Sequence, residues 1–372
     1  MSNWMFKLRG ELNRSQSLML GLVGFLLFIL VWWLASEQLS VYKYIDPAYT
    51  QDLAGLTDMQ RDSTAVADSL RTVKMREAGE LDSIKTYRVL PPPMKVLGSY
   101  GSLINKDMLL SHTLKSLWVN IQGYVWAVII SVVLGFLIGL FPLFRGLFNK
   151  QIEAIRYLPL SALVGLFLVW FGIGTGMKVA FLAFGILVYL LPIVVQRINE
   201  VKDVYLKTVH TLNANNWQTI KSVYLPSVME KLIDDVRVLT AISWTYIILA
   251  EGYNKEGGLG NLIWNSSKKG QLDKVFALLI VIVIIGFIQD QVFKQMDRKL
   301  FPHKNYKRML PGLKESKIGV LVALGALLAA VLINSFFGLP ALLSKLIWLL
   351  VLAAIVITFF GEFSTRKALA ND

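Results

Sequence analysis

The stretch IRYLPLSALVGLFLVWFGIGTGMKVAFLAFGILVYLLPIV, residues 155–194, holds two apolar runs separated by a short glycine-rich connection. The runs lie near 155–172 and 178–196. Each is close to the roughly 20 apolar residues that a membrane-spanning helix needs. The connection GIGTGMK is too short for anything but a tight turn. This stretch therefore predicts two membrane helices and places the chain in the all-α membrane class.

The composition agrees with that class. Hydrophobic residues make up 55% of the 372 residues, and charged residues only 17%, below the quarter or so that is usual in soluble domains. The formal net charge is +13. We attribute it to Lys and Arg in cytoplasmic loops rather than to a nucleic-acid partner. The chain has no cysteine and only three scattered histidines, which excludes disulfides and thiolate catalysis and argues against a zinc site.

Six further apolar runs bring the predicted number of spans to about eight. They lie at 18–35, 121–141, 233–250, 274–292, 318–336 and 342–361. If both termini are cytoplasmic, the basic short connections all fall on the cytoplasmic side, as the positive-inside rule requires. These connections are 142–156, 197–231 and 294–317.

The segments before the first core span are of a different kind. We expect LMLGLVGFLLFILVWWLA, 18–35, to be an uncleaved anchor, because its apolar region is too long for a signal peptide. The middle of the polar segment that follows, 45–88, predicts a solvated helix or helical hairpin outside the membrane. The three prolines at 91–93 should stop any helix there.

Motifs for catalysis are missing from the sequence. There is no G-x-x-x-x-G-K-[ST] phosphate loop, and EGGLG at 256–260 lacks the strand and the Lys-Ser/Thr that would make it one. We interpret it as a loop. Ionisable residues such as Asp234, Asp235, Arg237 and Glu251 stand at span ends, where an interfacial position is the commoner explanation. We therefore expect no catalytic residue, metal site or cofactor in this chain.

A polar hairpin lies between the fourth and fifth spans. VKDVYLKTVHTL (201–212) and NWQTIKSVY (216–224) both carry apolar residues at helical spacing. Asn213 stands between them, and asparagine is the residue after glycine that best tolerates positive φ. Asn215 and Asn216 are interpreted as solvated, and Pro226 is expected to end the second helix. Two short amphipathic helices favour a docking surface for a soluble partner and an interfacial connector about equally.

The same residues resemble a known signature. Permease subunits of ABC importers carry E-A-A-x-x-x-G, followed after nine residues by hydrophobic-x-Leu-Pro. Placing Leu225-Pro226 on that ending puts Asn213 at the glycine and Lys207-Thr208-Val209 at Glu-Ala-Ala. The chain departs from the signature at the glycine and, with a reversed charge, at Lys207. The residues that match or align with the signature, and that the resemblance implies contact an ATPase, are Lys207, Leu212, Asn213, Ala214, Trp217, Gln218, Leu225 and Pro226.

Other segments extend the resemblance, in order, over about 90–303. They are similar to the nitrate/sulfonate/taurine branch of the same family. The matching segments are VLPPPMKVLGSY, LSHTLKSLWVNIQGYVWA, the opening stretch with its WFGIG element, LAEGYNKEGGLGNLIW and GFIQDQVFKQMDRKLFP.

The resemblance implies a multi-span helical bundle of the type I importer (MetI-like) kind, with a core of five spans and one N-terminal span. The expected parts are an N-terminal anchor 1–40, an external polar helical insertion 41–90, and the permease core 91–303 with its cytoplasmic hairpin 197–231. A basic linker and two extra C-terminal helices, 304–372, complete the chain.

The resemblance also implies partners. Such permeases pair as homodimers in the bacterial inner membrane, each copy docking a cytoplasmic ATPase, and an external solute-binding protein delivers a small anionic or polar solute. ATP and Mg²⁺ would be used by the ATPase, and this chain would perform no bond chemistry. The open alternatives are an ion-coupled carrier or channel and, more weakly, a membrane-anchored assembly factor using 45–88.

Overall fold

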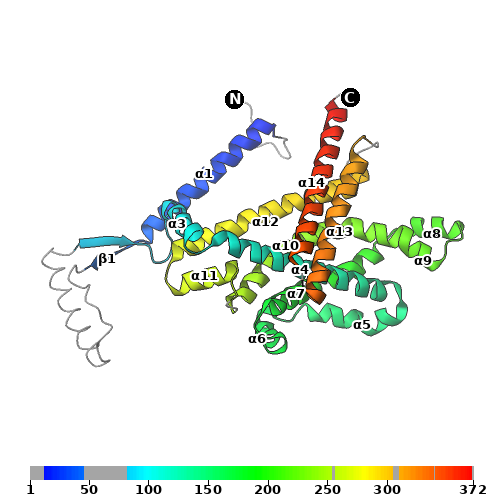
Figure 1. Cartoon of the computed structure of the whole chain (residues 1–372), viewed down its shortest axis with the longest axis horizontal. Coiled ribbons are helices and arrows are strands. Elements are labelled where there is room, and N and C mark those ends of the chain that lie inside the picture. The colour runs from blue at the N-terminus through cyan, green and yellow to red at the C-terminus, as the bar shows by residue number, and fades with distance from the viewer. Residues whose placement is uncertain (1–11, 46–81, 254–255, 305–309, 339, 371–372) are drawn as a thin grey trace. The chain divides into compact units, whose positions relative to one another are not determined.

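The computed structural model describes residues 12–45, 82–253, 256–304, 310–338 and 340–370, and nearly all of them are helical (Figure 1). Two compact units are present. One comprises Met1–Lys106 with Asn265–Ala277, and the other comprises Asp107–Trp264 with Leu278–Asp372. The all-α membrane class predicted from the apolar runs is confirmed.

The first unit contains the N-terminal span α1 (Arg14–Gln38) and helix α3 (Pro93–Asn105). Two side chains of α1 bind the backbone that precedes α3: Trp32 Nε1 donates to the carbonyl of Pro91 at 3.0 Å, and Ser36 Oγ to that of Leu90 at 2.8 Å. The three prolines were predicted to stop a helix. Instead, a helix begins at the last of them. Pro93 occupies the first turn of α3, where a missing N–H costs no hydrogen bond.

The same unit holds a feature that the sequence did not predict. Strands β1 (Val41–Ile45) and β2 (Asp82–Thr86) pair antiparallel, with Val41 opposite Thr86 and Ile45 opposite Asp82. The expected helical insertion lies mostly at 46–81, outside the described residues. Its two described ends are strands rather than helix, and VYKYI is rich in the β-branched and aromatic residues that favour a strand.

The second unit is a helical bundle. Its elements in chain order are α4 (Leu109–Leu140), α5 (Pro142–Ile155), α6 (Leu160–Phe171), α7 (Thr175–Asn199), α8 (Asp203–Thr211), α9 (Asn216–Thr219), a π-helical segment (Ile220–Tyr224), α10 (Leu225–Gly252), α13 (Leu313–Phe337) and α14 (Ala341–Ala370). Helices α11 (Leu259–Lys268) and α12 (Leu272–Leu300) contribute residues to both units.

Six described helices are long and apolar enough to cross a membrane: α1, α4, α7, α12, α13 and α14. Each contains one of the predicted apolar runs. The run predicted near 155–172 is the 12-residue α6, bent by 108° from α5, and together the pair could form a seventh span. Pro159 explains the break, because the residue before a proline is disfavoured in helix. The connection predicted at 142–156 is therefore largely the helix α5.

The predicted fifth span, 233–250, lies inside the 28-residue helix α10. This helix is not among the candidate spans, since Asp234, Asp235 and Arg237 interrupt its apolar sequence. About eight spans is thus roughly consistent with the observed helices.

Helices α4 and α7 pack closely together, and glycines on α4 make that approach possible. A Cβ atom on Gly135 would lie 2.5 Å from Val194 Cγ1, and one on Gly139 would lie 2.6 Å from Ile198 Cδ1. Small residues spaced four apart commonly let membrane helices pack backbone against side chain. This packing fixes the end of α7, from which the polar hairpin emerges.

Candidate functional site

The turn of the hairpin, residues 201–226, is built around Asn213. This residue has φ of 56°, one of two non-glycine residues with positive φ in the described part of the chain. The amide of Asn213 donates to the carbonyl of His210 at 3.0 Å, and that of Ala214 to the carbonyl of Val209 at 3.1 Å. These two bonds form a Schellman motif, the usual way for a helix to end at a left-handed residue. The prediction that Asn213 supplies the positive-φ turn is confirmed.

A capping box begins the next helix two residues later. Asn215 Oδ1 accepts from the Gln218 amide at 2.8 Å, and Gln218 Oε1 accepts from the Asn215 amide at 2.9 Å. The prediction that Asn215 is only solvated is therefore wrong. Asn215 satisfies backbone donors that the start of α9 would otherwise leave open. The capping box follows the Schellman motif directly, so the turn is specified from both sides.

The second arm of the hairpin continues without a break into α10. Pro226 was expected to end a helix, but it lies in the first turn of α10. The π-helical segment Ile220–Tyr224 comes just before it, and the Leu225 amide donates to the carbonyl of Ile220. A proline inside a regular α-helix clashes with the carbonyl four residues earlier. The wider π turn accommodates the ring, so the arm and α10 form one helical rod.

The hairpin is largely exposed and carries several large apolar side chains. No residue of α8 is buried. Among its large apolar side chains, the most exposed are Val204 (67%), Leu212 (76%) and Trp217 (70%). Seven of the eight predicted contact residues are exposed, and Ala214 is half-buried. Several large apolar side chains exposed along one hairpin indicate an interaction surface.

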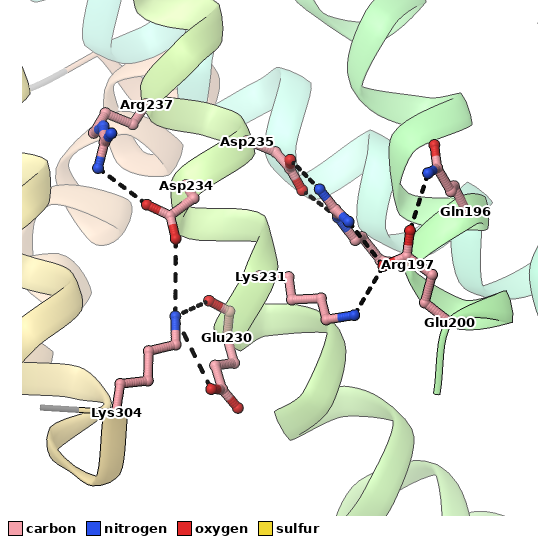
Figure 2. Close-up of polar contacts among 9 residues, drawn as sticks. All are labelled: Gln196, Arg197, Glu200, Glu230, Lys231, Asp234, Asp235, Arg237 and Lys304. Carbon is pink, nitrogen blue, oxygen red and sulfur yellow. Dashed lines mark hydrogen bonds and ion pairs between the residues drawn. The ribbon is translucent and has the colours of Figure 1, made fainter. Parts of the chain in front are cut away.

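Ion pairs fix the base of the hairpin to two helices of the bundle (Figure 2). Arg197, in the last turn of α7, donates from Nε and Nη2 to both carboxylate oxygens of Asp235 on α10, at 2.8 and 2.7 Å. Its Nη1 donates to Glu200 at 2.8 Å, and Lys231 of α10 donates to the same carboxylate at 2.8 Å. A bidentate arginine–carboxylate pair has a defined geometry. The end of α7, where the chain leaves the bundle, is therefore held to the first part of α10, where the chain returns to it.

These bonds keep Glu200 ionised. The hydrogen bonds from Lys231 and Arg197 lower the pKa of Glu200 from its usual 4.5 to about 2. The carboxylate thus remains charged across the physiological pH range.

A second group of ion pairs joins α10 to α12. Lys304 Nζ lies 2.9 Å from both the Glu230 carbonyl oxygen and Asp297 Oδ1, and 3.9 Å from the carboxylate of Asp234. Figure 2 shows its ammonium group between Glu230 and Asp234. The acidic residues that sequence position alone suggested to be interfacial thus tie α10 to its neighbours.

The sequence analysis did not predict one buried polar cluster, which is centred on Glu251. Glu251, whose place at a span end suggested an interfacial residue, is only 1% exposed. It accepts from Ser116 Oγ at 2.7 Å and from the Gly260 amide at 2.8 Å. The glycines of EGGLG were the signal that could have revealed this burial. A Cβ on Gly258 would lie 2.2 Å from the Glu251 carboxyl carbon, so only glycine lets the loop pass this close to the carboxylate. The loop predicted at EGGLG is confirmed for residues 256–258, with positive φ at Gly257 and Gly258, whereas Leu259 and Gly260 begin α11.

The comparisons with known proteins agree with this geometry. Residues 107–302 match the family described as binding-protein-dependent transport system inner membrane component. The chain belongs to this family. It is accordingly a multi-pass inner-membrane protein with the helical bundle of a transport permease, and α13 and α14 lie outside the matched residues.

Among its relatives, a Bacillus subtilis protein named as the aliphatic sulfonates transport permease SsuC is 24% identical over 220 residues, which cover 58% of this chain and 79% of that protein. The taurine transport system permease TauC of Escherichia coli is 26% identical over 218 residues, covering 57% and 79%. A solved structure of the MetNI methionine ABC transporter in inward-facing conformations aligns with a TM-score of 0.47 at 16% identity, over 52% of this chain and 98% of that one.

Proposed function

We propose that this chain is the membrane-spanning permease subunit of an ATP-driven importer, and that hairpin 201–226 is where a separate ATPase docks. The observation that carries the proposal is the hairpin itself: it exposes large apolar side chains, and its second arm is continuous with α10. Such an arm can carry a displacement to the bundle, because no loop interrupts it. Membership of the family supports the same function.

The eight residues predicted from the signature are proposed to form the contact. Leu212 and Trp217 supply the apolar anchors, since large buried side chains dominate the energy of most interfaces. Asn213 sets the angle between the two arms. Lys207 is exposed on α8, so the reversed charge meets the partner rather than the permease. An ATPase that fits this chain should present an acidic residue there.

The remaining partners follow from the family. We propose a homodimer of this chain with two ATPase subunits, ATP and Mg²⁺ being bound and used by those subunits, and an external solute-binding protein that delivers the cargo. The N and C termini are then cytoplasmic. The names of the relatives favour a small polar or anionic solute of the sulfonate or taurine kind.

Coupling requires the hairpin to bind two states of the ATPase unequally. A ligand or partner shifts a conformational equilibrium only by its differential affinity for the two states. The rod from α9 to α10 then carries the displacement to the bundle, and the ion pairs of Arg197 make α7 move with it.

Co-purification tests the proposal. From native membranes, the wild-type chain should bring down a protein with a phosphate-loop ATPase motif. Leu212→Asp with Trp217→Asp should release it, while Leu212→Met with Trp217→Phe should retain it. Retention by the aspartate variant would show that the hairpin is not the dock.

Transport assays in membrane vesicles distinguish the importer from the alternative, an ion-coupled carrier. Uptake that needs internal ATP and survives an ionophore supports the importer. Uptake that continues without ATP and collapses with the ion gradient would replace it with the carrier.

A further inference from the structure

The second unit contains a groove with a volume of about 610 Å³, formed where α13 lies against the family region. A volume between about 300 and 1,000 Å³ is usual for a site that binds a small molecule. Its lining comes from α4, α6, α7 and α13 and includes Gln122, Trp126, Trp170, Val179, Asn334 and Ser335. Because α13 is outside the matched residues, one wall of this groove is an addition to the family bundle.

That wall is held in place by polar contacts. Asn334 Nδ2 donates to Gln122 Oε1 at 2.9 Å, and Trp126 Nε1 donates to Ser335 Oγ at 3.1 Å. Phe336 also packs edge-on against Trp126, with ring centroids 5.9 Å apart. Hydrogen bonds between polar side chains are a common means of joining membrane helices. The groove is thus a built feature between α4 and α13, and not a chance gap.

The same contacts make the interior of the groove apolar. Gln122, Asn334 and Ser335 are bonded within the protein, and Thr175 donates to Glu256 at 3.1 Å. None of the described residues that line the groove is charged. Water avoids apolar cavities that offer it few polar partners. A small anionic or polar solute would likewise find no counter-charge, so the groove is unsuited to the proposed cargo.

The position of the groove indicates what fills it. Helices α4, α7 and α13 are all long and apolar enough to cross a membrane, so the groove between them lies at the depth of the lipid tails. At one end, Trp170 and Phe171 are 62% and 54% exposed. Tryptophan side chains gather at the level of the lipid headgroups.

We propose that this groove is a binding site for one phospholipid. An acyl chain lies along Ile130, Val179 and Phe184, and the glycerol end lies at Trp170 and Thr175. The lipid completes the packing between α13 and the family region. It is held by dispersion contacts with the aromatic walls, which a chain in the surrounding bilayer would not have.

Photo-crosslinking tests the site. The full chain is placed in bilayer discs made with phospholipid that carries a diazirine on its acyl chain, irradiated, and digested for peptide mapping. Label should concentrate on the peptides of α4, α7 and α13 that line the groove. Label spread as strongly over the exposed face of α14, around Leu352 and Ile355, would reduce the site to ordinary bilayer contact.

Two variants that place a large side chain in the groove test the proposal further. A Cβ on Gly176 would meet nothing within 4 Å, so Gly176→Phe is the substitution chosen to place a ring in the groove. Val179→Trp fills it one turn further along. Both should lose the groove label at an unchanged unfolding temperature, and Leu352→Trp, on an exposed position 65% accessible, should keep it. Label that persists in both filling variants, or crosslinks from the groove to a second copy of the chain, would overturn the proposal.

Discussion

Replacing Asn213 by valine should disable the hairpin without damaging the bundle. The residue has φ of 56° and ends α8 through the amides of Asn213 and Ala214. Valine is β-branched and resists positive φ. The variant must either strain the turn or abandon it. Since the turn is exposed, neither outcome should alter the packed helices.

The size of the effect follows from the backbone. The left-handed conformation costs an ordinary residue about 1–2 kcal/mol, and asparagine avoids much of that cost by bonding locally. A change of 1 or 2 kcal/mol alters an equilibrium by about 5- to 30-fold. We therefore expect the affinity for the ATPase to fall by a factor in about that range, with the unfolding temperature of the membrane bundle unchanged.

Two measurements follow the change. Hydrogen exchange at the Ala214 amide reports the Schellman bond directly and should accelerate in Asn213→Val. Binding of the co-purified ATPase to the permease in bilayer discs reports docking. Asn213→Gly is the matched control, because glycine adopts positive φ without strain, and it should behave as wild type in both assays. Equal exchange rates and equal affinity for the valine and glycine variants would refute the reasoning.

Three other changes should have distinct effects. Arg197→Met leaves the partly buried Asp235 carboxylate without its bidentate partner, and should destabilise the protein by about 1.5–3 kcal/mol, measured as a lower unfolding temperature and lost coupling of ATP hydrolysis to transport. Gly135→Val should cost about 1–3 kcal/mol by overpacking, whereas Gly165→Val, at an α6 position where a Cβ meets nothing within 4 Å, should unfold like wild type. Because Glu200 has its pKa lowered from 4.5 to about 2, its ion pairs stabilise the fold fully above pH 4.5 and progressively less as the pH falls toward 2. Glu200→Gln should therefore flatten the loss of thermal stability over that acid window, and an unchanged acid profile would show that these pairs contribute nothing.

The helices that cross the membrane were predictable because their signal is local. A run of about 20 apolar residues has few other stable conformations in a membrane protein. The Asn213 turn was predictable for a related reason: two amphipathic segments meet at a residue type that tolerates positive φ. Here spacing and chemistry in one short stretch were sufficient.

The errors arose where distant or neighbouring structure overrides a local rule. A proline usually stops a helix, but the π-helical segment before Pro226 provides the room that its ring needs. The strand Val41–Ile45 requires a partner some 40 residues away, which a pass along the chain does not reveal. Burial of Glu251 likewise depends on a loop that folds back over it, so its position at a span end was misleading.

The π-helical segment has a further consequence, for the direction in which the hairpin faces. Each residue of an α-helix turns the next by about 100°, so the wide turn at Ile220–Tyr224 sets the angular phase between Trp217 on the arm and the buried face of α10, around Leu232. Deleting one residue there would leave both helices intact yet rotate the docking face by about a quarter turn relative to the bundle. In the proposed role, the direction in which the docking surface faces is thus set by the five residues of this π-helical segment.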